Sequence, residues 1–149
     1  MKRFKWYLAL VLAGVLLVMV AGGCGSSDDS VKPPASYTSI SIPIEELQNQ
    51  PNIEAAMNDV VGGELTVTLG SNPTTGYRWS ETAEISDESI IKQVTHEFQA
   101  QENTEIVGAA GQEVWTFEAL KKGTATTIFR YSRSSEEALW TVTITTTVD

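Results

Sequence analysis

The sequence has few of the side chains that catalysis and metal binding need. Its 149 residues include one cysteine, Cys24, and one histidine, His96. A single cysteine excludes an intramolecular disulfide and a cysteine-rich metal site. The spacing of Ile90, Val94 and Phe98 predicts a strand that contains His96 in the same phase, so we interpret this histidine as structural. A hydrolytic site also needs a nucleophile and an orienting group, and we therefore predict no enzyme activity, metal or cofactor.

The charged residues give no sign of a catalytic pair or of nucleic-acid binding. Within residues 38–149, adjacent carboxylates occur at residues 45–46, 87–88 and 136–137, but neighbouring side chains on a strand point to opposite faces. We expect them on the solvated surface. No phosphate-cradling glycine loop is present. The formal net charge of −9 argues against a nucleic acid as partner.

The N-terminus has the layout of an export signal. Three basic residues within the first five positions precede an uncharged run over residues 6–21. That run is shorter than the ~20 residues of a transmembrane helix. The sequence Ala-Gly-Gly-Cys at positions 21–24 resembles the lipobox of bacterial lipoproteins. We predict that residues 1–23 are a signal peptide and that Cys24 carries lipid; an uncleaved signal anchor is the alternative, and both export the rest of the chain.

The residues after Cys24 divide into a tether and one domain. Residues 24–37 are rich in serine, aspartate and proline, which is typical of a flexible linker. Residues 38–149 are enough for a single domain with a sizeable core. Without a basic patch, the membrane contact would depend on the lipid. We expect a monomeric, extracytoplasmic domain anchored to the cell membrane.

The hydrophobic pattern predicts strands almost throughout this domain. Residues 37–44 and 64–69 alternate apolar and polar side chains, and further strands follow up to residue 148. One exception is a short helix expected after Pro51, where Ile53, Ala56, Met57 and Val60 recur at helical spacing and Asn52 could be its cap. About seven strands separated by turns predict an all-β, antiparallel, immunoglobulin-like β-sandwich. We place Trp79, Trp115 and Trp140 in its core rather than in a ligand site.

One loop combines a constrained backbone with small side chains. Pro73 fixes its own φ, Gly76 permits a positive φ, and Thr74 and Thr75 lie between them. Strand-like residues flank the loop on both sides, so it should join two strands. Such a rigid tip suits binding, although an ordinary polar turn has the same composition.

The residues of this loop carry a resemblance to a known family. Asn-Pro-Thr-Thr-Gly-Tyr-Arg-Trp at positions 72–79 resembles the signature loop of the chagasin family, whose members inhibit papain-like cysteine proteases. The glycine-rich segment at residues 108–117 resembles the family's second element. The third is an Arg-Pro-Trp loop after Tyr-x-Arg; here Arg133 is present, but Ser134 and Ser135 replace proline and tryptophan. The resemblance covers about residues 38–149, with residues 45–61 longer than expected.

This resemblance implies a fold and a mode of action. Three loops at one end of an immunoglobulin-like sandwich would enter the active-site cleft of a protease and block it without being cleaved. The first loop would place Thr74 near the catalytic thiolate, while the glycine-rich loop and the loop of Arg133 would contact the two walls. The residues implied to bind the protease are Asn72, Pro73, Thr74, Thr75, Gly76, Tyr77, Gly108, Ala109, Ala110, Gly111, Arg133, Ser134 and Ser135.

The two serines predict weaker or narrower inhibition than a complete third loop would give. Truncating a buried interface tryptophan often costs about 2 kcal/mol, roughly thirtyfold in affinity. The alternative function is therefore a lipid-anchored immunoglobulin-like binding or adhesion module that has lost inhibitory activity, since the fold alone does not define function.

Overall fold

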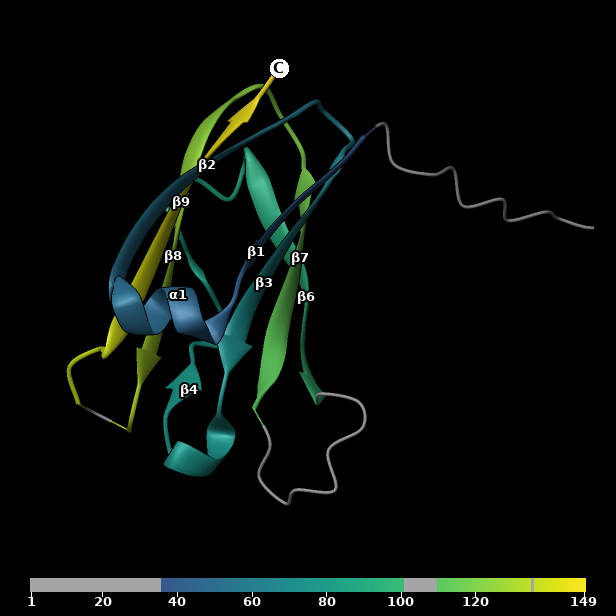
Figure 1. Cartoon of the computed structure of the whole chain (residues 1–149). Helices are drawn as coiled ribbons and strands as arrows, with labels where there is room; N and C mark the ends of the chain where they lie inside the picture. Colours follow the sequence, from purple (N-terminus) through teal and green to yellow (C-terminus); the bar gives the residue numbers. More distant parts are fainter. Residues whose placement is uncertain (1–35, 101–109, 135) are drawn as a thin grey trace, which may run out of the picture. The chain divides into compact units, whose positions relative to one another are not determined.

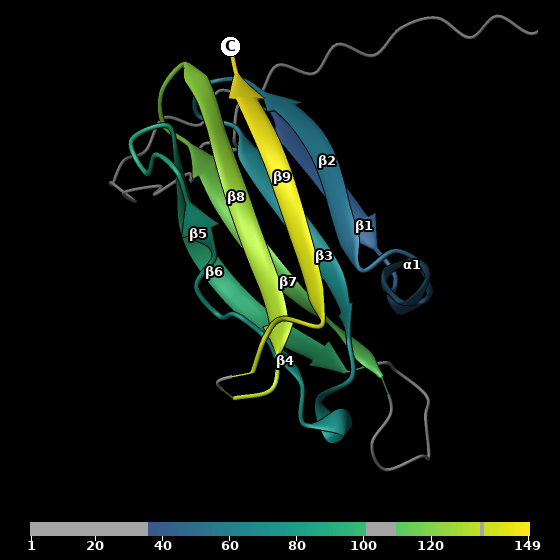
Figure 2. The same cartoon turned by 90° about the vertical axis from the view of Figure 1, so that its left-hand side faces the viewer.

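Two β-sheets facing each other make up the computed structural model, which describes residues 36–100, 110–134 and 136–149 (Figures 1 and 2). The predicted signal peptide and most of the predicted tether lie outside these residues. The first sheet has the strand order β1-β3-β7-β6, and the second has the order β2-β9-β8-β4, with β5 also paired to β8. The elements are β1 (Tyr37–Ile42), α1 (Ile44–Asn49), β2 (Asn52–Asp59), β3 (Glu64–Ser71), the 3-10 turn η1 (Pro73–Thr75), β4 (Arg78–Trp79), β5 (Glu84–Ile85), β6 (Ile91–Ala100), β7 (Gly111–Ala119), β8 (Gly123–Ser132) and β9 (Trp140–Val148).

The predicted all-β sandwich is confirmed, with two parallel pairings added to it. β1 pairs in parallel with β3, and β2 pairs in parallel with β9, whereas every other pairing among the described strands is antiparallel. β1 and β2 are consecutive in the chain but belong to different sheets, so they do not form a hairpin with each other. Each instead adds to the edge of its own sheet, which makes both sheets mixed.

The short helix predicted after Pro51 is wrong, because this segment is the strand β2. Its register pairs Ile53 with Val142 and Met57 with Thr146. Ile53 and Met57 are buried and Ala55 is half-buried between them, so alternate residues point inward as in a strand. The segment forms a strand in spite of its weak helical pattern, because it pairs with the free edge of β9. The helix lies earlier, as α1, where Leu47 is fully buried.

The common phase predicted for Ile90, Val94 and Phe98 is also wrong in part, because β6 does not keep one alternation along its length. The register between β6 and β7 shifts at a bulge between Gln93 and Thr95. A bulge places two residues opposite one and changes which side chains face inward. Val94 at the bulge is therefore 58% exposed, and Phe98 on this edge strand is 45% exposed.

Aromatic side chains from both sheets meet in the core. Trp79 and Trp140 come from the second sheet and Trp115 from the first, and all three are buried, as predicted. The Trp79 ring lies edge-on to Trp115, with 6.4 Å between centroids. Phe129 is fully buried and packs edge-on against Trp115 as well. Edge-to-face contacts of this kind add to the hydrophobic stabilisation and fix the two sheets relative to each other.

None of the helical segments within residues 36–100, 110–134 and 136–149 is both long and apolar enough to cross a membrane.

Candidate functional site

The loops singled out in the sequence leave the sandwich at one end. In the first sheet, Ser71 at the end of β3 pairs with Gly111 at the start of β7, and Gly111 pairs with Ala100 at the end of β6. In the second sheet, Arg78 at the start of β4 pairs with Ser132 at the end of β8. The chain between β3 and β4 therefore crosses from one sheet to the other at this end, as the teal segment around β4 shows (Figure 1). Of the glycine-rich loop, Gly108 and Ala109 lie outside the described residues, as does Ser135 of the third loop.

The first loop is a single turn with an exposed tip. Pro73–Thr75 form a 3-10 turn, and Gly76 closes it with φ of +82°. The prediction that glycine serves a positive φ here is confirmed. The Thr75 hydroxyl donates to the carbonyl oxygen of Asn72 at 2.7 Å, and the Thr74 hydroxyl donates to Asn72 Oδ1 at 2.6 Å. The loop is thus hydrogen-bonded within itself, while Thr74, Thr75 and Gly76 are exposed.

Both ends of the loop are held by buried aromatic side chains of the second sheet. The Tyr131 hydroxyl accepts from the backbone N–H of Asn72 at 3.0 Å and donates to its carbonyl oxygen at 3.2 Å. Trp79, which follows the loop, donates its indole N–H to the carbonyl oxygen of Gly70 at 2.9 Å. Tyr131 is 1% exposed, so these hydrogen bonds are shielded from water. The loop leaves the sandwich in one fixed direction.

Arg133, from the third loop, braces the first loop from the side. Its Nη2 donates to the carbonyl oxygen of Thr75 at 2.7 Å, and its guanidinium lies 4.7 Å from the ring centroid of Tyr77. The Tyr77 ring stacks in turn on Tyr131, with 5.7 Å between centroids. The sequence alone predicted a contact between Arg133 and a protease. The structure adds a contact within the chain. The guanidinium of Arg133 is a cation that both donates a hydrogen bond to the first loop and lies over the aromatic face of Tyr77.

Ser134 has a backbone conformation that proline cannot adopt. Its φ is +49°, in the left-handed region, whereas proline fixes φ near −65°. The proline missing from the third loop therefore could not be restored without rebuilding the backbone next to Arg133. The serine at position 134 thus goes with a backbone conformation of this loop that a proline at the same position could not have.

A polar cluster that the sequence analysis missed lies below the first loop. The Ser71 hydroxyl donates to Glu113 Oε1 at 2.7 Å, and His96 Nε2 lies 2.8 Å from Glu113 Oε2. The His96 ring stacks on Trp115 with 4.7 Å between centroids, so this histidine has the structural position predicted for it. The missed signal was a glutamate in the inward phase of Trp115, where the alternation predicts an apolar residue.

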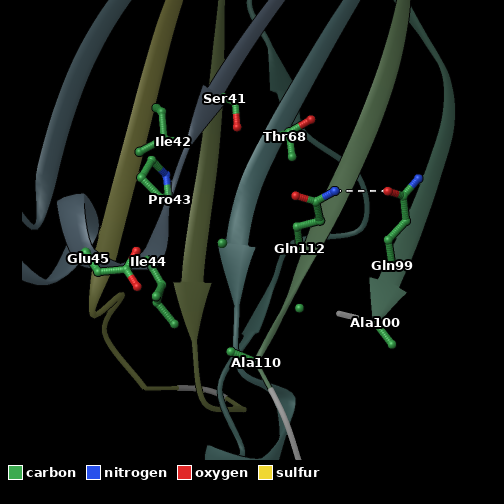
Figure 3. Close-up of a pocket in the computed structure, with 12 residues that line it drawn as sticks. Ser41, Ile42, Pro43, Ile44, Glu45, Thr68, Gln99, Ala100, Ala110 and Gln112 are labelled. Carbon is green, nitrogen blue, oxygen red and sulfur yellow. Dashed lines mark hydrogen bonds between the residues drawn. The ribbon is translucent and has the colours of Figure 1, made fainter. Parts of the chain in front are cut away.

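A groove of about 600 Å³ lies on the first sheet beside Gly111, at the start of β7. Figure 3 shows Pro43 and Ile44, at the start of α1, on one side of it, and Gln112 on β7 hydrogen-bonded to Gln99 on β6 on the other. The distance between Gln112 Nε2 and Gln99 Oε1 is 3.0 Å. Ala110, which follows residues 101–109 in the chain, lines the groove as well. The lining mixes apolar side chains with amides and hydroxyls.

The site offers a shaped surface rather than a set of reactive groups. Its exposed tip presents hydroxyls and backbone, and the Glu113 carboxylate and the His96 imidazole are engaged with each other below the surface. Across the described part of the chain, no three side chains of the metal-ligating types gather closely enough to hold an ion. A stiff, convex loop with small side chains is suited to entering a cleft in another protein.

Comparisons with solved structures find the same fold in three other proteins, one of which is named as a cysteine protease inhibitor. The crystal structure of the cysteine protease inhibitor EhICP2 from Entamoeba histolytica is 20% identical to this chain, with a TM-score of 0.58 over 78% of this chain and 99% of that one. PbICP-C, in its complex with falcipain-2, is 17% identical, with a TM-score of 0.57 over 77% of this chain and all of that one. The solution structure of amebosin is 22% identical, with a TM-score of 0.50 over 76% and 98% of the two chains. At these identities the likeness establishes the fold.

The family is established by sequence. No curated protein sequence matches the chain. The family model described as chagasin family peptidase inhibitor I42 matches residues 60–148, which include the first loop, the glycine-rich segment and Arg133. This is a family of inhibitors and not of enzymes, in agreement with the prediction. Because the match spans well over half of the chain, the protein belongs to the chagasin family of peptidase inhibitors.

Proposed function

We propose that the protein is a reversible, non-covalent inhibitor of papain-like cysteine proteases, and that its first loop fills the active-site cleft. The observation that carries this proposal is the turn from Pro73 to Gly76, which is exposed from Thr74 onward, closed by its own hydrogen bonds and held at both ends by the sandwich. The relative PbICP-C, of the same fold, is known in a complex with falcipain-2, a papain-like cysteine protease.

The stiffness of the loop supports tight binding. Ordering a flexible loop on association costs free energy, and a loop already fixed by Tyr131 and Arg133 avoids most of that cost. The three loops together can cover an interface of a standard size, about 1,600 Å² in total. We assign the first loop, Asn72 to Tyr77, to the catalytic centre, and the segments Gly108 to Gly111 and Arg133 to Ser135 to the two walls of the cleft.

The same stiffness explains why the loop would not be cleaved. Attack by a thiolate needs the scissile carbonyl carbon about 3–3.5 Å away and aligned with the nucleophile. The Thr75 carbonyl oxygen is bonded to Arg133, and the Pro73 carbonyl oxygen accepts from the Gly76 N–H at 3.1 Å. These hydrogen bonds resist the rotation that would bring a peptide bond into line. The loop blocks the cleft and stays intact.

Removing the brace should weaken inhibition with little effect on folding. Arg133→Met deletes the hydrogen bond to the Thr75 carbonyl oxygen and the charge over Tyr77, and we expect inhibition about tenfold weaker, or about 1.4 kcal/mol. Arg133→Lys keeps the charge but loses the planar, forked guanidinium, so its inhibition constant should lie between those of the unaltered chain and Arg133→Met. Arg133 is exposed, and we expect the midpoint of thermal unfolding to be nearly unchanged. Equal inhibition by all three proteins would contradict the brace.

We also propose that the domain is attached to the cell membrane through lipid on Cys24. The support is the sequence alone: a charged, then apolar, then small-residue signal over residues 1–23, followed by the cysteine and a polar tether that leads to the domain of residues 38–149. The domain would then lie on the extracytoplasmic side of the membrane.

Fractionation of cells that express the protein tests the anchor. The unaltered chain should sediment with membranes and stay there in high salt. The Cys24→Ala variant should no longer be labelled with lipid, and residues 1–23 should no longer be cleaved from it. Ser26→Ala, two residues further on, serves as a matched control that should behave like the unaltered chain. Recovery of the unaltered chain in the soluble fraction would contradict lipid attachment.

One observation favours a second candidate function, a binding or adhesion module without inhibitory activity. Ser134 and Ser135 stand where the family pattern has proline and tryptophan, and Ser134 adopts a conformation closed to proline. Inhibition constants against several papain-like proteases, with a serine protease as control, separate the two functions. The proposed inhibitor slows the papain-like enzymes and leaves the serine protease active. A binding module leaves both active.

A further inference from the structure

A charged side chain lies inside the sandwich directly below the first loop. Glu113 occupies an inward position on β7, in the same phase as Trp115 and Phe117, and is 5% exposed. Burying a carboxylate costs free energy unless hydrogen bonds satisfy it, and an apolar side chain would serve the stability of the core at least as well. Packing alone therefore does not account for a glutamate at this position.

Both carboxylate oxygens of Glu113 are used, each toward a different strand. Oε1 accepts from the Ser71 hydroxyl on β3, and Oε2 is paired with His96 on β6. Ser71 is fully buried, and the His96 ring is held flat against Trp115. Glu113 thus joins the three strands β3, β7 and β6 through side chains, at a place where few backbone pairs remain before the strands end.

The cluster lies at the origin of two of the three loops. Ser71 is the last residue of β3, and Asn72 follows it as the first residue of the first loop. Ser71 also pairs with Gly111, where the glycine-rich segment enters β7. Asn72 is gripped from the second sheet by Tyr131, so the base of the first loop is held from both sheets: by Glu113 through Ser71 on one side, and by Tyr131 on the other.

We propose that Glu113 is a positioning residue of the inhibitory site, which through Ser71 and His96 fixes the base of the first loop and of the glycine-rich loop. This inference rests on the proposed function, since it assigns to Glu113 a part in inhibition without contact with the protease. A buried polar group of this kind gives one geometry rather than extra stability, because only one arrangement satisfies all of its hydrogen bonds.

Three variants of the full-length chain, purified in detergent micelles, test the proposal against papain. Glu113→Leu removes both hydrogen bonds, and Ser71→Ala removes the bond to the loop base alone. Glu113→Gln keeps an oxygen for the Ser71 hydroxyl and an amide that can donate to an unprotonated His96 Nε2. We expect inhibition at least tenfold weaker for Glu113→Leu and severalfold weaker for Ser71→Ala, with most of the loss restored in Glu113→Gln.

Two further measurements distinguish positioning from a loss of stability. Hydrogen exchange of peptides covering residues 71–77 should accelerate in Glu113→Leu and Ser71→Ala well below their unfolding temperatures. Prolonged incubation with excess papain should cut the first loop in these variants but not in the unaltered chain. Glu118→Leu, the same change at an exposed position of β7, is the matched control and should behave like the unaltered chain.

The outcomes separate this inference from the proposed function. If the unaltered chain leaves papain active, the proposed function fails, and exchange in residues 71–77 still tests the positioning. Glu113 has no positioning role if the unaltered chain inhibits papain and both Ser71→Ala and a folded Glu113→Leu inhibit as strongly as it does. In that case hydrogen exchange of residues 71–77 would also be the same in all three proteins. Should Glu113→Leu fail to fold, the inhibition constant and loop exchange of Ser71→Ala decide the matter.

Discussion

Thr74→Arg should abolish tight inhibition, weakening it by a factor of about 100 or more, which corresponds to about 2.7 kcal/mol. Thr74 is exposed at the tip of the first loop, where the proposed complex leaves room only for a small side chain. An arginine there adds a long side chain and a charge that would have to be buried in the cleft without a partner. The inhibition constant against papain, measured by titration, gives the size of the loss.

The fold should survive this substitution, because Thr74 is exposed and its hydroxyl hydrogen-bonds within the loop, to Asn72 Oδ1. Surface changes of this kind alter the free energy of unfolding by about 0.5 kcal/mol or less. Thr124→Arg is the matched control: Thr124 is an exposed threonine near the start of β8, at the opposite end of the sandwich from the loops. Inhibition by Thr74→Arg equal to that by Thr124→Arg would remove the first loop from the mechanism.

Gly76→Val should weaken inhibition by a similar factor for a different reason. Gly76 has φ of +82°, and a Cβ added there would lie 3.3 Å from Nε of Arg133. A β-branched residue at positive φ is strained by about 1–3 kcal/mol, and relieving the strain would open the turn or push Arg133 off the Thr75 carbonyl oxygen. The variant would then have to order its loop upon binding, and the inhibition constant would rise.

A second glycine provides the control for strain alone. Gly62 has the same φ of +82° but lies in the turn between β2 and β3, away from the loops. Gly62→Val should lower the free energy of unfolding by about as much as Gly76→Val, again about 1–3 kcal/mol, yet inhibit like the unaltered chain. Denaturant unfolding together with inhibition constants separates the two effects. Equal loss of inhibition in both variants would attribute it to general destabilisation.

The fold was predictable where one periodicity dominates. In β3 apolar residues alternate from Leu65 to Leu69 and in β7 from Trp115 to Ala119, and Trp115 and Phe117 fall in the core as expected. Prediction failed in β2, whose Ile53 and Met57 are four residues apart and so fit a helix and a strand equally well. The strand forms because β9 offers an unpaired edge, and that edge is a property of the assembled sheet and not of the segment.

The site was predictable where a residue's backbone or chemistry is distinctive. The positive φ of Gly76 follows from its place after a proline-containing turn, and it is observed. The roles of Arg133, Tyr131 and Glu113 are defined by partners distant in sequence: Arg133 meets Thr75, Tyr131 grips Asn72, and Glu113 binds Ser71. Local patterns do not contain such pairings. A glutamate in an apolar phase was the single local sign of the buried cluster.

The most direct test of the proposed inhibition is a titration of papain with the purified protein. After long incubation with papain, the mass of the protein is then measured to find out whether it has been cleaved. We predict loss of peptidase activity with a stoichiometry of one inhibitor per enzyme, relieved by excess substrate, and recovery of the first loop uncut. A protease that keeps its full rate at every inhibitor concentration, or that cleaves the chain between Pro73 and Gly76, would contradict it.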